Sequence, residues 1–325
     1  ARRMQALQFH EMGMGEAIPI SALHGSGVGD LLDMLVHVLG VPPDAEGEQL
    51  GTEAGVWPAS PEAEPVRIAI VGRPNVGKST LLNRLLGEER MIVSAIPGTT
   101  RDAVDTRLDY LGQPLVLIDT AGIRRRGRIL PGVEKYSVLR ALKAIDRAQV
   151  ALLLLDAVEG VTAQDAHIAG LILERLRSAV LLVNKWDAVP QSASSQAEFT
   201  AAVRRALSFL DYVPALFISA LTGEGVEQVL PTALRVQEQR LRQIPNAELN
   251  RLVEAAQERH APPSKAGKRL QIYSSEQLRA DPPTFLFRVN DPRLVHFSYS
   301  RFLENRLRDE YGFLGTPIRL TFRRR

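Results

Sequence analysis

The chain has 325 residues, of which 45% are hydrophobic, 24% charged and 6% aromatic. At about 100–200 residues per domain, this length predicts two or three domains, and the apolar content excludes a wholly disordered chain. These residues include no cysteine, which excludes disulfides, thiolate metal sites and cysteine nucleophiles among them. No apolar run reaches the ~18 residues that a membrane helix needs, and the first residues do not form a signal peptide. We therefore expect a cytoplasmic protein without a membrane partner.

The net charge of +3 is distributed unevenly along the chain. Of the 40 Lys and Arg and the 37 Asp and Glu, residues 235–325 hold 18 and 10, a surplus of +8. The remaining 22 and 27 give the rest of the chain a charge of −5. A basic module attached to a mildly acidic one suggests a polyanion as partner, although a solvated basic surface would give the same numbers.

Residues 1–40 contain a short predicted strand, 17–20, followed by a segment that the chain repeats. Ser21–Leu32 and Ser219–Leu230 are identical at seven of twelve positions, and each copy follows a predicted strand. Such self-similarity indicates duplication. The second copy closes an α/β domain, so we expect residues 1–40 to be the C-terminal remnant of another one, because one strand and one helix cannot form an independent core. Chance similarity in a stretch rich in Ala, Gly, Ser and Leu is the alternative interpretation.

Residues 41–65 are predicted to be an acidic, proline-rich linker. They include six acidic residues, no basic residue and five prolines. Such a segment cannot bury enough apolar surface to order itself. Its glycine and proline content also indicates a domain boundary.

Residues 66–235 are predicted to form a doubly wound α/β domain. Five short, nearly continuous apolar runs alternate with amphipathic stretches, which is typical of a parallel sheet covered by helices on both faces. Thr106–Tyr110 alternates in polarity and is predicted to be an antiparallel or edge strand. The predicted buried strands are Arg67–Val71, Pro114–Ile118, Val150–Leu155, Val180–Val183 and Ala215–Ile218, and the predicted helices are Ser79–Leu86, Val133–Ile145, Ala163–Arg177 and Ala197–Leu210.

Residues 236–325 follow a different pattern, which predicts a small, basic α+β unit with a three-stranded sheet. Its predicted elements, in chain order, are helix Leu249–Arg259, strands Arg269–Tyr273 and Thr284–Asn290, helix Tyr299–Tyr311 and strand Pro317–Phe322.

A phosphate-binding loop follows the first buried strand of the α/β domain. Residues 72–79, Gly-Arg-Pro-Asn-Val-Gly-Lys-Ser, match G-x-x-x-x-G-K-[ST] between a strand and a helix. Gly72 and Gly77 allow the backbone to turn successive N–H groups towards the phosphates. We expect Lys78 to contact the β- and γ-phosphate oxygens and the Ser79 hydroxyl to bind Mg²⁺.

Two further motifs follow buried strands and predict a guanine nucleotide. Asp119-Thr-Ala-Gly122 offers a carboxylate that can hold Mg²⁺ through water and, at Gly122, an N–H for the γ-phosphate. Asn184-Lys-Trp-Asp187 offers a carboxylate for N1–H and N2–H₂ of guanine. Adenine would leave this carboxylate unpaired, so GTP is favoured over ATP.

A candidate switch loop, Pro97-Gly-Thr-Thr-Arg-Asp102, lies between the first helix and the second strand of this domain. We expect the Thr100 hydroxyl to bind Mg²⁺, with Thr99 as the neighbour that could exchange roles and a simple loop cap as the alternative. Backbone N–H groups of Ser219 and Ala220 are expected near guanine O6. The residues expected to bind the nucleotide are Gly72, Asn75, Val76, Gly77, Lys78, Ser79, Thr80, Asp119, Gly122, Asn184, Lys185, Asp187, Ser219, Ala220 and Leu221.

With these motifs, the chain resembles the Der (EngA) family of bacterial double Era-like GTPases. The resemblance implies two tandem GTPase domains followed by a KH-like domain, slow GTP hydrolysis and assembly of the large ribosomal subunit through ribosomal RNA. It makes residues 1–40 the remnant of a first GTPase domain, residues 66–235 the second and residues 236–325 the KH-like domain, in a protein that we expect to be a monomer. The resemblance extends through Gly72–Ser79, Gly98–Asp102, Asp119–Arg125, Gly132–Arg140, Asn184–Asp187, Asn290-Asp-Pro and Phe297-Ser-Tyr.

One departure from the Ras pattern bears on catalysis. Ras-like GTPases carry Gln after Asp-x-x-Gly to orient water, whereas this chain has Ile123, which cannot. The resemblance implies that K⁺ replaces an arginine finger and that Asn75 holds this ion against the transferring phosphate. A loop-stabilising role of Asn75 is the alternative. The residues expected to act in catalysis are Lys78, Thr100, Gly122 and Asn75, and the candidates for positioning the water are Asp102 and Glu134.

The C-terminal unit departs from ordinary KH domains, which bind RNA through a G-x-x-G loop between two helices. Gly312-Phe-Leu-Gly315 follows a helix and leads into a strand, so we interpret it as a helix C-cap and turn. Contacts between the unit and RNA phosphates, or between the unit and the GTPase domains, are both open. The candidates for the phosphate contacts are Lys265, Lys268, Arg269 and Arg323–Arg325.

Two other functions are compatible with the motifs. A tRNA-modification GTPase would share the Gly-Thr-Thr-Arg-Asp switch and the K⁺ chemistry, but those proteins end in a short cysteine-containing motif. An RNA-binding scaffold would use its nucleotide site only as a structural element.

Overall fold

The computed structural model describes residues 64–87, 91–93, 105–120, 133–190, 195–262, 264–265 and 268–325. Residues 61–325 belong to one compact unit. The predictions made for residues 1–40 and for the linker up to residue 63 lie outside the described residues, as do those for Thr100 and Gly122. Among the described residues, no helix is long and apolar enough to cross a membrane.

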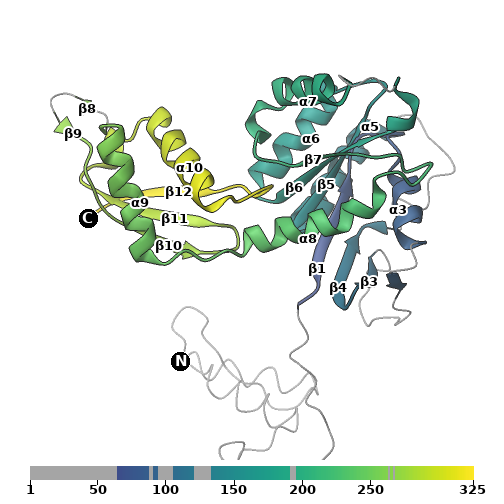
Figure 1. The fold of residues 1–325 in the computed structure, drawn as a ribbon, viewed down its shortest axis with the longest axis horizontal. Helices are drawn as coiled ribbons and strands as arrows, with labels where there is room; N and C mark the ends of the chain where they lie inside the picture. Colours follow the sequence, from purple (N-terminus) through teal and green to yellow (C-terminus); the bar gives the residue numbers. More distant parts are fainter. Residues whose placement is uncertain are drawn as a thin grey trace, which may run out of the picture. The chain divides into compact units, whose positions relative to one another are not determined.

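In the described part of the chain, seven strands form one mostly parallel sheet in the order β2-β3-β4-β1-β5-β6-β7 (Figure 1). Strand β1 pairs in parallel with β4 on one side and with β5 on the other, and this reversal of winding opens a crevice at the carboxyl ends of the strands. As the alternating pattern predicted, β3 is antiparallel to both neighbours. The strands are β1 (Val66–Val71), β2 (Met91–Val93), β3 (Thr106–Tyr110), β4 (Gln113–Ile118), β5 (Val150–Asp156), β6 (Ser178–Asn184) and β7 (Ala215–Phe217).

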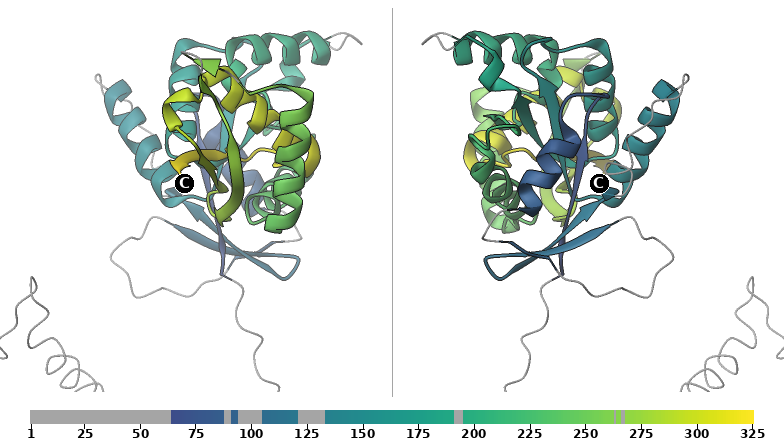
Figure 2. Two further views of the ribbon diagram at one scale, coloured as in Figure 1. Left: turned by 90° about the vertical axis from the view of Figure 1, so that its left-hand side faces the viewer. Right: turned by 90° about the vertical axis from the view of Figure 1, so that its right-hand side faces the viewer.

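Helices cover both faces of this sheet, which confirms the predicted doubly wound α/β fold (Figure 2). Every residue of β5 and β6 is buried, and successive side chains enter opposite cores: Leu152 packs in one and Leu153 in the other. This explains why their sequences are continuously apolar. One face is covered by α3 (Lys78–Leu86) and α8 (Val229–Arg240), and the other by α5 (Val133–Arg147), α6 (Ala163–Glu174) and α7 (Ser195–Ala206).

The boundaries of several elements differ from the prediction. Helix α7 ends at Ala206 rather than at Leu210, and Ser208–Leu210 form a separate 3₁₀ turn. Helix α6 ends at Glu174 rather than at Arg177, because Leu176 adopts a left-handed φ of 50° that a helix cannot accommodate. Strand β6 begins at Ser178, two residues earlier than predicted, because Ser178 and Ala179 pair with Val150 and Ala151 of β5. The buried Ser178 hydroxyl bonds that of Thr316 at 3.0 Å. Strand β2 was not predicted.

The C-terminal domain places two helices on one face of a three-stranded sheet ordered β10-β11-β12. Strands β10 and β11 are antiparallel, and β11 and β12 are parallel. The core between helices and sheet includes Phe285 and Phe287, both fully buried. The elements are α9 (Asn246–Arg259), β10 (Ile272–Arg279), β11 (Thr284–Val289), α10 (Phe297–Tyr311) and β12 (Arg319–Arg324), with a small hairpin of β8 (Ser264–Lys265) and β9 (Lys268–Arg269).

The predicted three-stranded sheet is present, but its first strand lies further along the chain than the predicted Arg269–Tyr273. Strand β10 continues to Arg279 through polar residues that its pattern does not mark as a strand. The polar side chains of β10 that face the helices form hydrogen bonds. Ser275 Oγ donates to Asn250 Oδ1 at 3.0 Å, and Gln277 Nε2 donates to the Arg242 carbonyl at 2.9 Å.

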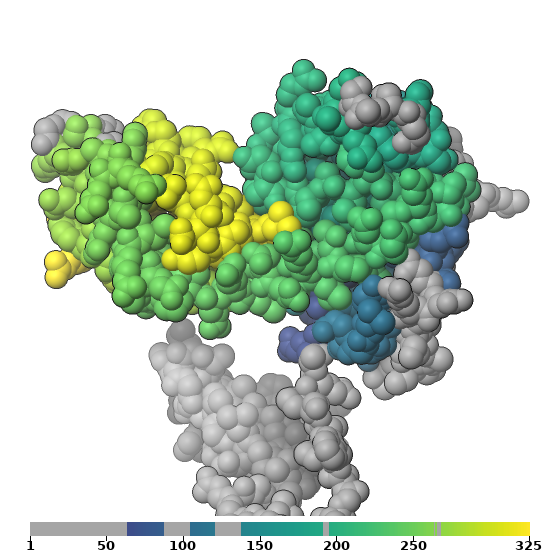
Figure 3. All heavy atoms as spheres, in the orientation of Figure 1, coloured from purple at the N-terminus to yellow at the C-terminus, as the bar shows by residue number. Residues whose placement is uncertain are grey.

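The Gly312–Gly315 segment joins the two domains. Gly312 is the C-cap of α10, as predicted, and its N–H donates to the Arg308 carbonyl at 2.8 Å. The Gly315 N–H donates to the Tyr212 carbonyl at 2.9 Å, and its carbonyl accepts from the Ala179 N–H at 2.8 Å. A Cβ on Gly315 would lie 2.7 Å from the Ala179 carbonyl oxygen. In the space-filling view, atoms of the C-terminal domain pack directly against the sheet domain (Figure 3).

A buried arginine adds a second link between the domains. The predicted boundary between residues 235 and 236 lies inside α8, which continues to Arg240. The Arg240 side chain is 1% exposed and donates to Asp281 Oδ1 through Nε at 2.7 Å and Nη2 at 2.6 Å, and to the Leu176 carbonyl at 2.8 Å. Burial lowers the pKa of Arg240, and the negative charge of Asp281 opposes that effect.

Candidate functional site: a nucleotide crevice

The loop between β1 and α3 follows a path that requires glycine at two positions. Gly72 has φ 147° and Gly77 has φ 101°, values that L residues rarely adopt. A Cβ on Gly72 would lie 2.7 Å from the Leu154 carbonyl oxygen, and one on Gly77 would lie 2.2 Å from Nδ2 of Asn184. Both glycines therefore serve the backbone turn and the close approach of neighbouring elements.

The Lys78 ammonium lies against the carbonyls of the loop that it follows. Its Nζ donates to the Gly72 carbonyl at 2.8 Å and to the Arg73 carbonyl. Lys78 is also the first residue of α3, so the N-terminus of that helix faces the same loop, and helix N-termini attract phosphate. Val76 is fully buried and anchors the loop in the core, whereas Asn75 is exposed with a left-handed φ of 64°.

Asn184 connects the phosphate loop to the loop that follows β7. Its Nδ2 donates to the Val76 carbonyl at 2.7 Å, and its Oδ1 accepts from the Ala220 N–H at 2.9 Å. The Asn184 side chain is buried, so both bonds are shielded from water. The phosphate and base loops are therefore held in one arrangement by a single amide.

Lys185 and Asp187 follow Asn184 beyond the end of β6. Lys185 Nζ lies 2.6 Å from Oδ2 of Asp156, the last residue of β5. Burial would raise the pKa of Asp156, but hydrogen bonds from Lys185 and two backbone N–H groups outweigh burial, so the pKa lies below its usual value. Asp187 is exposed, in a single helical turn, Trp186–Ala188, whose Trp186 ring packs 4.5 Å from that of Phe217.

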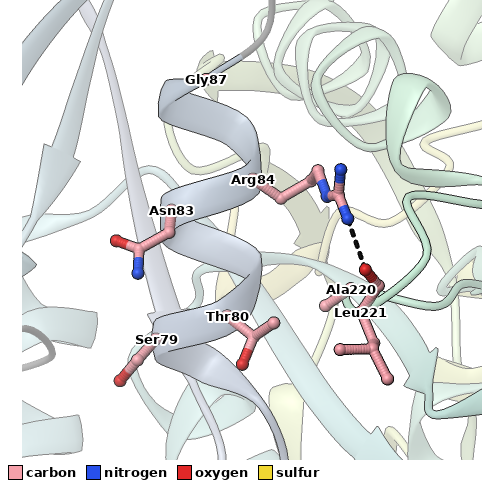
Figure 4. Close-up of a pocket in the computed structure, with 7 residues that line it drawn as sticks. All are labelled: Ser79, Thr80, Asn83, Arg84, Gly87, Ala220 and Leu221. Carbon is pink, nitrogen blue, oxygen red and sulfur yellow. Dashed lines mark hydrogen bonds between the residues drawn. The ribbon is translucent and has the colours of Figure 1, made fainter.

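The loop after β7 is attached to α3 by an arginine that the sequence analysis did not identify. An Arg84 guanidinium nitrogen, Nη2, donates to the Leu221 carbonyl (Figure 4). The loop also closes on itself, because the Thr222 N–H donates to Ser219 Oγ at 3.0 Å. Between helix and loop lies a hollow of about 420 Å³. Its lining residues are Ser79, Thr80, Asn83, Arg84, Gly87, Ala220 and Leu221.

Asp119 follows β4, next to β1, and so lies at the same edge of the sheet as the phosphate loop. It has a left-handed φ of 58°, and its N–H donates to Asp105 Oδ1 at 3.1 Å. The next residue, Thr120, bonds the Thr106 hydroxyl at 2.8 Å. Gly122, predicted to contact the γ-phosphate, and Thr100 belong to segments outside the described residues.

A charged cluster behind the phosphate loop was also not predicted. Arg73 lies at ion-pair distance from Glu159 and, at 3.4 Å, from the fully buried Asp165. Asp165 forms a capping box with Thr162 at the start of α6. The only available signal was the Thr-x-x-Asp spacing, which predicts a helix start but not its contact with Arg73.

Three family models match parts of the chain. Residues 67–185 match a model described as 50S ribosome-binding GTPase, and residues 130–255 match one described as elongation factor Tu GTP binding domain. Residues 243–323 match a model described as KH-domain-like of EngA bacterial GTPase enzymes, C-terminal.

Relatives with known names match this chain over its whole length. The protein named GTPase Der from Thermomicrobium roseum is 52% identical over 326 residues, which cover 100% of this chain and 68% of that protein. The GTPase Der of Chloroflexus aggregans is 50% identical over 325 residues, covering 100% of this chain and 69% of that protein. A solved structure of Era, in complex with MgGDPNP and nucleotides 1506-1542 of 16S ribosomal RNA, is a distant match with 22% identity and a TM-score of 0.41, covering 80% of this chain and 92% of that chain.

Proposed function

The chain belongs to the GTPase Der family, and from this premise we propose that its GTP hydrolysis serves as a switch in the assembly of the large ribosomal subunit. Family membership implies GTP, GDP and Mg²⁺ as ligands. The ribosomal role is supported by the description of the family model that residues 67–185 match. The observation that carries the proposal is the crevice itself, where Asn184 ties the phosphate loop to the base loop.

Nucleotide binding would use groups that are already directed at the crevice. The phosphates would lie over the α3 N-terminus, and Lys78 would exchange its bonds to the loop carbonyls for bonds to phosphate oxygens. Guanine would bind to Asp187 beside the loop 219–221, and the Ala220 N–H, which donates to Asn184 Oδ1 in this structure, would have to be shared with or released to guanine O6. The remaining residues of the proposed nucleotide site are Gly72, Asn75, Val76, Gly77, Ser79, Thr80, Asp119, Gly122, Lys185, Ser219 and Leu221.

The donors near the phosphate loop fit a magnesium ion. Ser79 offers a hydroxyl from α3, and Asp119 offers a carboxylate from the adjacent strand, the hard oxygen ligands that Mg²⁺ prefers. Bound Mg²⁺ would neutralise charge on the phosphate oxygens. Thr100 is proposed as a further hydroxyl ligand, and Gly122 as an N–H donor to the γ-phosphate.

We further propose that K⁺ stimulates hydrolysis and that Asn75 holds it. The exposed position and left-handed backbone of Asn75 support a role towards a ligand rather than in the core. A cation there would add positive charge where the transferring phosphate becomes more negative. Single-turnover hydrolysis should be faster in KCl than in NaCl, and Asn75→Ala should remove the difference; equal rates for the unaltered chain would contradict the proposal.

We also propose a domain organisation, a cellular location and an oligomeric state. Residues 1–40 would be the remnant of a first GTPase domain, residues 66–235 the second GTPase domain and residues 236–325 the KH-like domain. A monomer in the cytoplasm would suit a protein that binds ribosomal RNA.

The experiment that tests the ribosomal proposal is co-sedimentation with ribosomal subunits at constant salt. Binding to the large subunit should require a non-hydrolysable GTP analogue and be lost with GDP. Binding that is equal in both states would favour the scaffold alternative. Absence of binding in both states would contradict the proposed function. Loss of GTP turnover in Lys78→Ala would separate an enzymatic site from a structural one.

A further inference from the structure

The three-stranded sheet of the C-terminal domain has one face that the helices leave open. Helices α9 and α10 pack on the face that carries Phe285, Phe287 and Phe322. Because side chains alternate along a strand, the intervening residues point to the opposite side. We call this side the open face. A β-bulge between Ile272 and Ser274 interrupts the alternation, so that Tyr273 and Ser274 both belong to it. Its residues are Tyr273, Ser274, Glu276, Arg279, Thr284, Leu286, Arg288, Arg319, Thr321, Arg323 and, directly after β12, Arg325, of which Thr284 and Leu286 are buried.

The arginines of the open face repel one another. Arg288 and Arg323 are directly opposite on neighbouring strands, an arrangement that destabilises a sheet when the charges have the same sign. All five arginines of this face, Arg279, Arg288, Arg319, Arg323 and Arg325, are exposed. Within the described residues, the ion pair of this face is Arg288 with Glu276, at 3.2 Å. The face therefore carries uncompensated positive charge, and a bound polyanion would relieve the repulsion.

An aromatic ring lies among these charges. The Tyr273 side chain is 47% exposed, although tyrosine buries a large apolar area when it can. The Arg325 guanidinium carbon lies 5.2 Å from the centre of the ring, and the Tyr273 hydroxyl donates to Gln271 Oε1 at 3.2 Å. An exposed, oriented ring surrounded by arginines is the combination that binds single-stranded nucleic acids, by base stacking and phosphate contacts.

The G-x-x-G segment cannot supply this function, because it is committed to the domain junction. Gly315 bonds Ala179 and Tyr212 through its backbone, and Phe313 is fully buried. RNA that reached this domain would therefore need another surface, and the open face offers both charge and an aromatic ring.

We propose that the open face binds single-stranded RNA, with a base stacked on Tyr273 and phosphates bound by the surrounding arginines. The inference rests on the proposed function only for its physiological ligand, ribosomal RNA. A duplex would contact the arginines but would present no unstacked base to Tyr273. A protein or a second copy of the chain would not need the ring to stack on a base.

The test uses the 325-residue chain and a fluorescein-labelled 12-nucleotide single-stranded RNA, with binding measured by anisotropy over a range of KCl concentrations. Tyr273→Ala should weaken binding about 5- to 140-fold, the range for one stacked base, while Tyr273→Phe should bind like the unaltered chain. Arg323→Gln with Arg325→Gln should reduce the slope of log K against log salt by about 1.4, because each lost phosphate contact on a single strand contributes ~0.7.

The matched control removes two exposed arginines from α9, on the other side of the sheet, as Arg251→Gln with Arg259→Gln. Irradiation of RNA containing 5-iodouridine should crosslink the peptide that includes Tyr273. The proposal is overturned if the unaltered chain does not bind the single strand, if the control weakens binding as much as the open-face pair does, or if a duplex binds equally well and Tyr273→Ala has no effect. Binding of RNA without sedimentation with ribosomal subunits would contradict the proposed function and leave this inference standing.

Discussion

The buried ion pair between the domains should respond unequally to the loss of its two ends. Asp281→Ala would leave the Arg240 guanidinium, 1% exposed, without a counter-ion, whereas Arg240→Met would leave the Asp281 carboxylate, 38% exposed, in contact with water. Breaking a buried pair typically destabilises by about 3–5 kcal/mol. Since Arg240 keeps its bond to the Leu176 carbonyl, we expect about 3 kcal/mol for Asp281→Ala. Arg240→Met loses that bond and should destabilise by about 1–2 kcal/mol.

The double variant distinguishes this reasoning from simple loss of contacts. With both charges removed, its stability should resemble that of Arg240→Met and exceed that of Asp281→Ala. Urea unfolding monitored by circular dichroism gives the free energies, and hydrogen exchange of the Ala179 N–H, which bonds Gly315 across the junction, reports local opening. A larger destabilisation by Arg240→Met than by Asp281→Ala, or additive effects of the two changes, would contradict this role of the buried charge.

Three other changes have defined outcomes. Arg84→Ala removes the hydrogen bond to the Leu221 carbonyl and should speed GDP dissociation about 5-fold, with an intermediate rate for Arg84→Lys. The rate is measured by chasing bound fluorescent GDP with unlabelled GDP, and an unchanged rate would contradict the role given to Arg84. The pKa of Asp156 is lower in the folded chain than its unfolded value of ~4, so its carboxylate stabilises the fold above about pH 4 and loses this effect as the pH falls through the folded pKa. The difference in free energy of unfolding between the unaltered chain and Asp156→Asn, measured by urea titration, should therefore narrow below about pH 4. A constant difference would argue against the ion pair. Gly315→Ala places a Cβ on a residue with left-handed φ and against its neighbours, and should destabilise the chain by about 2–4 kcal/mol. The control Gly112→Ala also has a positive φ, but its Cβ would meet nothing within 4 Å, so it should destabilise by about 1–2 kcal/mol. Equal effects in the same urea assay would show that the clash is absent.

The sheet could be predicted because its strands are buried on both faces. Strands β5 and β6 have no exposed residue, so their sequences are continuously apolar and leave little doubt about their structure. Strand β10 is the opposite case, because Ser275 and Gln277 face the helices and are satisfied by hydrogen bonds rather than by apolar contact. Its partners become visible only once the fold brings α9 beside the strand.

The phosphate and base motifs could be predicted because each is a continuous run of residues directly after a strand. The contacts that hold these loops together could not. Arg84 and the Leu221 carbonyl are 137 residues apart, and an arginine on an exposed helix face has no sequence signal. Arg73 and Lys185 likewise carry no signal, because their acidic partners, Asp165 in α6 and Asp156 at the end of β5, were not associated with the site.

We propose that the state of this nucleotide site controls binding to the large ribosomal subunit. The most direct test changes its base specificity with Asp187→Asn, because an asparagine amide pairs with xanthine where the aspartate carboxylate pairs with guanine. Co-sedimentation of this variant with large subunits should require a non-hydrolysable XTP analogue, while the unaltered chain should require the GTP analogue. If the variant still binds subunits in response to the GTP analogue, or binds equally without any nucleotide, this site does not control the interaction.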